Sequence, residues 1–324
     1  MTVASIEKPW LRFLPAMVIA LFLLAAPLFL GTALVSLLTK ILIFSLLAMS
    51  LDIAFGYTGL WSFGHAAIFG AGAYTSGILI VQCNITSFWL AAPGGVLMAV
   101  LASAAFGFIA LRVSGIYFLL VTFALGQLVF SIATKWKTMT GGSDGLAGIP
   151  YPEIGFSFSA HSFYYFVIII FILCAFALYR ISQSPFGYSL QGIREDETRM
   201  RCLGYNTWLH KYLAFMISGL FGGIAGVLYV YFNGLIAPEN VGMVGSGSVI
   251  IMTIIGGSGT LWGGIIGSAV IFLFEYFASL FTPERWPIIL GACFVATVTF
   301  ARGGIFPLLA SVWIKTIRGG HPRR

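Results

Sequence analysis

The sequence predicts an all-α polytopic membrane protein of about ten transmembrane helices. Of its 324 residues, 59% are hydrophobic and only 8% are charged, and the mean hydropathy is +0.99. A water-soluble fold needs roughly a quarter of its residues charged to keep its surface hydrated. In addition, apolar segments recur along the chain, and most approach the roughly 20 residues with which a helix crosses the hydrocarbon. Together these observations exclude a soluble protein.

The apolar segments follow one another with turn or polar residues between them. They lie at about residues 13–37, 41–55, 63–82, 88–111, 115–134, 161–180, 211–233, 248–256, 263–281 and 287–303. Two are too short to cross alone, because 41–55 runs into GYTG and 248–256 runs into GGSGTLWGG. We expect both to be interrupted helices. Their similar positions in the two halves, with TGLW in one and TLW in the other, suggest an internal repeat.

Basic residues divide unevenly between alternate loops. With the amino terminus in the cytoplasm, thirteen of the 17 Lys and Arg residues fall on the cytoplasmic side, and the other four are Lys40, Lys135, Lys137 and Arg285. This positive-inside asymmetry predicts cytoplasmic amino and carboxyl termini. It also accounts for the net charge of +7. No nucleic-acid partner is expected, because no basic stripe with interleaved aromatic residues is present.

The largest polar segment on the cytoplasmic side, residues 180–211, predicts a compact helix-turn. Ser184 can cap a helix that begins with Pro185. Gly204 supplies a left-handed stop further along. On pattern alone, the segment is either a solvated loop stabilised by its own ion pairs or a helix that docks on another protein.

Charges in this segment match the helix dipole. Glu195, Asp196 and Glu197 fall early in a short predicted helix, whereas Arg199 and Arg201 fall late. Glu195 with Arg199 and Glu197 with Arg201 are i to i+4 pairs in the favourable order. The pattern therefore predicts a rigid charged turn across the cytoplasmic surface.

Several motifs resemble those of branched-chain amino acid ABC transporter permeases. They are GYTGL from Gly56, SFGH from Ser62, GAGAY from Gly70, TGGSDGL from Thr140, REDE from Arg194, RCLG from Arg201, KYLAF from Lys211, SGLFGGIAG from Ser218, Ala237-Pro238-Glu239 and GGSGT from Gly256. They follow the order of the family and extend over about residues 45–303. Two positions depart from its pattern: Asp52, where Asn is more usual, and the segment 301–304.

The resemblance implies a single permease domain over residues 1–324 in a bacterial inner membrane. It implies a homologous second permease subunit, two ABC ATPase subunits and a periplasmic or extracellular binding protein that delivers branched-chain or related hydrophobic amino acids. Residues 181–210 would form the loop that couples to the ATPases, with contacts at Arg194, Glu195, Glu197, Arg201 and Gly204. This chain has no GxxxxGK[ST] motif, so we expect ATP to be bound by the partners and no cofactor by the chain itself.

Polar and glycine residues around the two breaks are the candidates for a translocation pathway: Asp52, Gly56, Tyr57, Gly59, His65, Gly257 and Gly259. Broken helices expose backbone amides and carbonyls within the membrane, and polar groups there need a partner or water. Asp52 can accept a hydrogen bond from His65 or from freed amides. His65 is either a ligand or a packing group. Glu275 and Gln127 either face a pore or bond across helices.

Neither a catalytic nor a metal site is predicted. The four histidines occupy unrelated segments, and the four cysteines are too far apart for a metal motif. Two alternatives to a branched-chain amino acid permease remain. One is an ABC permease for urea, short amides or sugars. The other is an ion-coupled secondary transporter, which explains the spans and breaks but gives no reason for the charged helix-turn.

Overall fold

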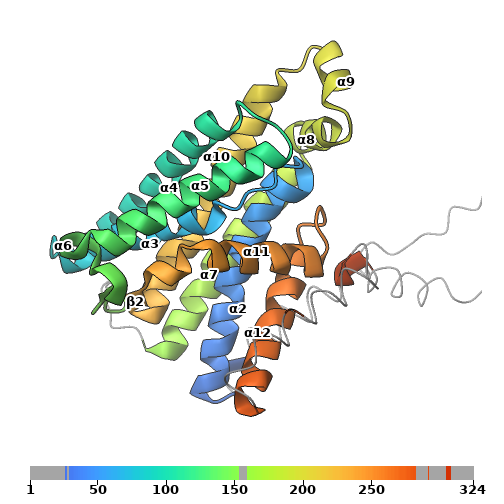
Figure 1. Ribbon diagram of the computed structural model, residues 1–324. Helices are drawn as coiled ribbons and strands as arrows, with labels where there is room; N and C mark the ends of the chain where they lie inside the picture. Colours follow the sequence, from blue (N-terminus) through green and yellow to red (C-terminus); the bar gives the residue numbers. More distant parts are fainter. Residues whose placement is uncertain (1–25, 28, 153–158, 282–290, 292–303, 308–324) are drawn as a thin grey trace, which may run out of the picture.

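Helices make up nearly all of the structure, a computed structural model that describes residues 26–27, 29–152, 159–281, 291 and 304–307 (Figure 1). Within these residues, five helices are long and apolar enough to cross a membrane, and three shorter helices are also apolar. The predicted all-α polytopic fold is therefore confirmed. Most of the predicted span 13–37 and, except for one residue, the predicted span 287–303 lie outside the described residues.

The long helices follow the predicted order. They are α2 (Thr32–Asp52, continued by the π-helix η2, Ile53–Tyr57), α4 (Phe88–Ala110), α5 (Ile116–Lys135), α7 (Ala160–Ser182) and α10 (Thr207–Asn233). The shorter apolar helices are α3 (His65–Val81), α11 (Met243–Gly256) and α12 (Gly263–Phe281). From α3 to α12, each predicted span overlaps one helix, and the largest boundary differences are at the starts of α10 and α11.

The predicted boundary between the first two spans is wrong. α2 runs without a break through Lys40, and together with η2 it forms a helix of 26 residues. Lys40 lies within α2 and not in a loop, and its ammonium group pairs with Glu275 of α12 at 3.2 Å. A paired charge can be accommodated within a membrane helix. The predicted short span 41–55 is therefore a full-length helix, and GYTG ends it instead of interrupting it.

α10 occupies the centre of the bundle and packs against α2, α3 and α4. Small residues bring these backbones together. A Cβ on Gly226 of α10 would lie 2.1 Å from the carbonyl oxygen of Phe69 in α3, so only glycine fits there. This is the close packing that the small-residue spacing of the sequence indicates. On its other side, α2 contacts α7, α11 and α12 (Figure 1).

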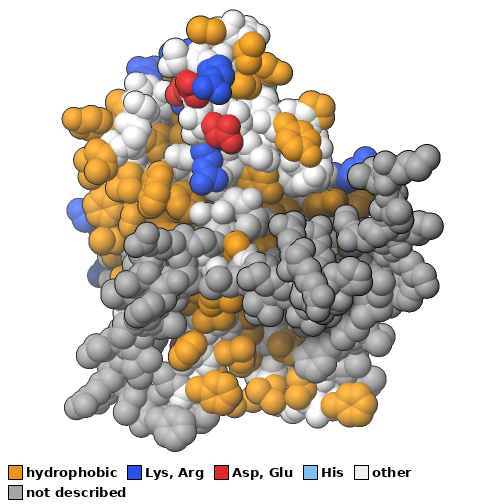
Figure 2. Space-filling model, turned by 90° about the vertical axis from the view of Figure 1, so that its right-hand side faces the viewer, with side chains coloured by type: hydrophobic (Ala, Val, Ile, Leu, Met, Phe, Trp, Pro, Cys, Tyr) orange, Lys and Arg blue, Asp and Glu red, His pale blue; other side chains and the backbone are white. Residues whose placement is uncertain are grey.

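The two ends of the bundle carry different loops. At one end, β1 (Leu146–Ala147) pairs antiparallel with β2 (Leu235–Ile236) near α6 (Lys137–Thr140), η3 (Gly142–Asp144) and η4 (Pro238–Asn240). At the opposite end lie α8 (Pro185–Glu195) and α9 (Glu197–Cys202) (Figure 1). Acidic and basic side chains gather over this second end (Figure 2). Its assignment to the cytoplasm stays a prediction.

Candidate functional site

The two glycine-rich breaks lie against each other. The first is the end of η2 at Gly56 and Tyr57, and the second is the loop 257–262 between α11 and α12. A Cβ on Gly56 would lie 2.3 Å from the backbone nitrogen of Gly259, a separation that real Cβ atoms essentially never show. Gly257 and Gly259 have φ values of +114° and +80°, which glycine adopts at no steric cost. Glycine at these positions therefore allows the two segments to meet. We call this contact the break junction.

Asp52 ties the second break to α2. Its side chain is buried, and its two carboxylate oxygens accept hydrogen bonds from the backbone amides of Gly259 at 2.7 Å and Leu261 at 2.9 Å. Of the two partners that the sequence left open, the amides are observed and His65 is not. A buried carboxylate is costly without hydrogen-bond donors. These two bonds therefore hold the second break against the end of α2.

Arg194 connects α8 with the break junction. It lies in the last turn of α8, and its Nη1 donates a hydrogen bond to the carbonyl oxygen of Gly56. A Cβ on Gly59, where φ is +78°, would lie 3.3 Å from Arg194 Cγ, and a Cβ on Gly259 would lie 3.0 Å from its Nη1. The positive charge of Arg194 also acts on the carboxylate of Asp52. One side chain from the predicted coupling loop thus reaches both breaks.

Tyr57 and His65 are both buried, in different surroundings. Tyr57 is the last residue of η2 and directly follows the Gly56 contact. His65 opens α3, and its Nε2 lies 3.1 Å from Ser50 Oγ on α2 and 3.2 Å from Ser218 Oγ on α10. These bonds make His65 a group that holds three helices together. Any part that it takes in translocation stays a prediction.

The start of α8 forms as the sequence predicts. Ser184 is the N-cap, its Oγ accepts a hydrogen bond from the amide of Gly187 at 3.3 Å, and Pro185 occupies the first turn. At the far end, Gly204 has a φ of +89° and open space where a Cβ would be. The predicted left-handed stop after α9 is therefore confirmed.

The connection between α8 and α9 differs from the prediction. Glu195 is the last residue of α8 instead of an early residue of α9. The chain is extended at Asp196, which caps α9 by accepting a hydrogen bond from the amide of Arg199 at 3.0 Å. Arg199 accordingly pairs with Asp196, at 3.6 Å, in place of the predicted Glu195. The turn is thus two short helices hinged at Asp196.

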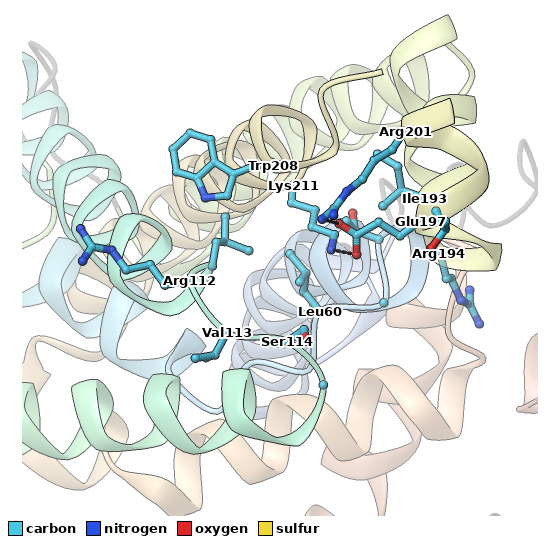
Figure 3. A pocket seen from close by; sticks show the side chains of 15 residues that line it. Leu60, Arg112, Val113, Ser114, Ile193, Arg194, Glu197, Arg201, Trp208 and Lys211 are labelled. Carbon is cyan, nitrogen blue, oxygen red and sulfur yellow. Dashed lines mark hydrogen bonds and ion pairs between the residues drawn. The ribbon is translucent and has the colours of Figure 1, made fainter. Parts of the chain in front are cut away.

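Glu197 joins α9 to α10. Its carboxylate accepts hydrogen bonds from Arg201 Nη2 at 2.6 Å, as the i to i+4 spacing predicts, from Thr207 Oγ1 at 3.0 Å, and from Lys211 Nζ (Figure 3). Partial burial raises the pKa of Glu197, but the hydrogen bonds from Lys211, Thr207 and Arg201 outweigh it and lower the pKa below its usual range. These contacts fix the position of the turn against the bundle.

The ion pair of Lys40 with Glu275 was missed from the sequence. Both side chains are about one-third exposed, at 33% and 31%, and Lys40 Nζ lies 4.5 Å from the ring centroid of Phe272. Of the two possibilities for Glu275, bonding across helices is the one observed. The sequence did contain a signal for this pair. Lys40 and Glu275 carry opposite charges and each lies among apolar residues, where a charge needs a partner.

The fold and the break junction define the class of protein. A bundle of apolar helices in which two glycine-rich helix ends meet, with a charged side chain reaching them from a helical loop at one end, is typical of a membrane transport protein. Among the described residues, no group of three or more His, Cys, Asp or Glu could hold a metal ion.

The chain belongs to the family described as "Branched-chain amino acid transport system / permease component", whose sequence model matches residues 33–298. It resembles the high-affinity branched-chain amino acid transport system permease protein LivM of Escherichia coli (strain K12). The two are 27% identical over 317 residues, which cover 90% of this chain and 74% of LivM.

Two further relatives are more distant or shorter in extent. The corresponding permease protein LivH of the same organism is 25% identical over 262 residues, 75% of this chain and 84% of LivH. The guanosine ABC transporter permease protein NupQ of Bacillus subtilis (strain 168) is 32% identical over 66 residues, 20% of this chain and 21% of NupQ. No solved structure matches the chain.

Proposed function

We propose that this chain is one permease subunit of an ATP-driven importer that carries branched-chain or related hydrophobic amino acids across the bacterial inner membrane. The family and the names of LivM and LivH support the substrate class. That two permease proteins of one organism both resemble the chain supports a homologous second permease as its partner. Two ATPase subunits and an external binding protein complete the proposed importer.

The contact of Arg194 with Gly56 is the observation that carries this proposal. An ATPase that docks on residues 181–210 moves α8, and Arg194 transmits the movement to the first break. Asp52 and Gly259 pass it on to the second break. In this arrangement Glu195, Glu197 and Arg201 contact the ATPase, and Gly204 sets the shape of the turn. ATP is bound by the partners, and this chain needs no cofactor.

The break junction favours ATP-driven transport over ion coupling. In a secondary transporter, Asp52 would be the natural ligand for a coupling ion. Here both of its oxygens already accept hydrogen bonds from backbone amides. An ion-coupled transporter also gives no reason for the charged turn of α8 and α9, whereas a docked ATPase does. Permeases of the same class for urea, short amides or sugars share these features, so the substrate needs a direct test.

Reconstitution into proteoliposomes tests the proposal. The chain is combined with a homologous permease, ABC ATPases and a binding protein from the same organism, and uptake of labelled leucine is measured with ATP. Unlabelled urea and glucose serve as competitors. We expect leucine uptake that requires ATP and the ATPases and that neither competitor reduces. Uptake that persists on an ion gradient without the ATPases would contradict the mechanism, and inhibition by urea or glucose would contradict the substrate class.

A further inference from the structure

A pocket of about 550 Å³ lies beside the break junction (Figure 3). Three segments enclose it: residues 58–60 after the first break, residues 111–115 between α4 and α5, and side chains of α8, α9 and α10. Arg112 lies on one side in Figure 3, and Arg201 and Lys211 lie on the other. The pocket is therefore built from three parts of the chain that are far apart in sequence.

Positive charge exceeds negative charge in this pocket. Four cationic side chains line it, Arg112, Arg194, Arg201 and Lys211, against the single carboxylate of Glu197, and of these Arg194 is already bonded to the carbonyl oxygen of Gly56. Arg201 and Lys211 share that carboxylate. Arg112 has no carboxylate partner among the ion pairs of the described residues. A concave site with an excess of one charge attracts a ligand of the opposite charge, so an anion is the expected occupant.

The surroundings of the pocket are apolar and exposed. The guanidinium group of Arg112 lies over the Phe108 ring, 4.9 Å from its centroid. Trp208 lines the pocket and stacks on Tyr212, with 5.1 Å between the two ring centroids. Such aromatic residues are enriched at the level of lipid headgroups. From the pocket, exposed apolar side chains continue along α4 and α5: Phe108, Ile109, Ile116, Tyr117 and Leu120. A ligand with a charged head and apolar tails matches both surfaces, whereas a free anion matches only one.

We infer that this pocket binds the phosphate headgroup of an anionic phospholipid, whose acyl chains lie along the exposed face of α4 and α5. Basic pockets at the ends of transmembrane helices bind such headgroups. Because Leu60 and Glu197 both line the pocket, the bound headgroup bridges the segment after the first break and α9. The inference rests on the pocket alone and does not depend on the transported substrate.

The test measures lipid binding to the purified full-length chain by native mass spectrometry. Phosphatidylglycerol is titrated against phosphatidylcholine of the same acyl length and against inorganic phosphate. We expect saturable binding of phosphatidylglycerol at least tenfold tighter than that of phosphatidylcholine. Each basic residue near an anionic lipid contributes about a fivefold change in affinity. The single variant Arg112→Gln should therefore bind about fivefold more weakly, and Arg112→Gln with Lys211→Gln about 25-fold more weakly.

A matched control removes two charges elsewhere. Lys135→Gln with Lys137→Gln lies at the opposite end of the bundle (Figure 1) and should keep the affinity of the wild type. Arg112 is exposed, so its single variant remains informative if the double variant misfolds. Equal losses in the Arg112 variant and the control would overturn the inference. So would the absence of selectivity for phosphatidylglycerol. Competition by inorganic phosphate as effective as that by the lipid would identify a free-anion site and exclude a lipid one.

Discussion

The two glycine-rich breaks use opposite halves of the peptide group. At the first break, a carbonyl oxygen is the bonded group, and Arg194 donates to it at Gly56. At the second break, amide groups are bonded, and Asp52 accepts from Gly259 and Leu261. A cation satisfies freed acceptors and an anion satisfies freed donors, as their chemistry requires. The helices that lead to the breaks also differ, since one has 26 residues with its π-helical end and the other only 14.

This difference teaches that neither break is simply a gap in a helix. Freed backbone groups in a membrane protein must find partners, and at the bonds described above each break takes its partner from a different part of the chain. Asp52 belongs to the helix before the first break but serves the second. Arg194 belongs to the loop at the end of the bundle but serves the first. The two breaks therefore depend on each other, and removing either charge should affect both.

Removing Asp52 should have the largest effect. Asp52→Ala leaves the amides of Gly259 and Leu261 without their acceptor, and hydrogen bonds to a charged group contribute roughly 1.5–3 kcal/mol each. We expect the free energy of unfolding to fall by about 3 kcal/mol, seen as a lower thermal midpoint of the purified protein. Asp52→Asn retains one acceptor oxygen and should lose about half as much. Equal stability of the two variants would show that the amides do not need this carboxylate.

Replacing Arg194 should affect coupling more than stability. Arg194→Met keeps the length of the side chain but cannot donate to the carbonyl of Gly56. Because coupling between sites typically amounts to about 1–3 kcal/mol, we expect ATP-dependent leucine uptake to fall by about tenfold while ATP hydrolysis continues. Arg199→Met is the matched control, since the Arg199 side chain is 74% exposed and its ion pair, with Asp196, lies within the turn. If both variants transport alike, Arg194 does not transmit movement to the first break.

Gly204 tests the turn that presents α8 and α9. With its φ of +89°, Gly204→Ala should cost about 1 kcal/mol of local strain although nothing crowds the position. Gly204→Trp adds bulk on the proposed ATPase face and should uncouple ATP hydrolysis from uptake while membrane insertion stays intact. Gly247→Ala is the control, because this position is equally open but lies in the regular helix α11. Unchanged coupling in Gly204→Trp would contradict the proposed docking face.

Much of the fold could be predicted because local rules decide it. Apolar length placed α3, α4, α5, α7 and α12 to within a few residues. Cap chemistry placed the start of α8 and the stop at Gly204. The error at Lys40 has a physical reason. A lone lysine in a hydrophobic segment favours a loop on sequence grounds, and its partner Glu275 is 235 residues away, a distance over which local patterns carry no information.

The site was only partly predictable for the same reason. The sequence identified Asp52, Gly56 and Gly259 as candidates, because a charge is costly within a membrane helix and clustered glycines at the ends of two short apolar segments indicate breaks. It could not show that they touch one another or that Arg194 reaches them. Those contacts depend on how α2, α8 and the loop before α12 pack in three dimensions. Asp196 was predicted to lie within the short helix, whereas in the structure it is the N-cap. The same charges fit both an i to i+4 pairing pattern and an N-cap pattern, and the sequence alone did not decide between them.

The smallest expected effect concerns pH and the charges of α9, which are partly exposed, unlike the buried carboxylate of Asp52. Hydrogen bonds hold the pKa of Glu197 below its ordinary value of 4.5. A carboxylate with a lowered pKa stabilises the folded protein at a pH above its unfolded pKa, and this contribution disappears as the pH falls through the folded pKa. Wild type should therefore unfold at a higher temperature than Glu197→Gln at pH 7, and the difference should shrink below about pH 4.5. Its size should be at most about 1 kcal/mol, as for other partly exposed ion pairs.

Arg201→Gln leaves Lys211 and Thr207 in place and should reduce the pH dependence without abolishing it. A difference between wild type and Glu197→Gln that does not change with pH would mean that packing, and not charge, attaches α9 to α10.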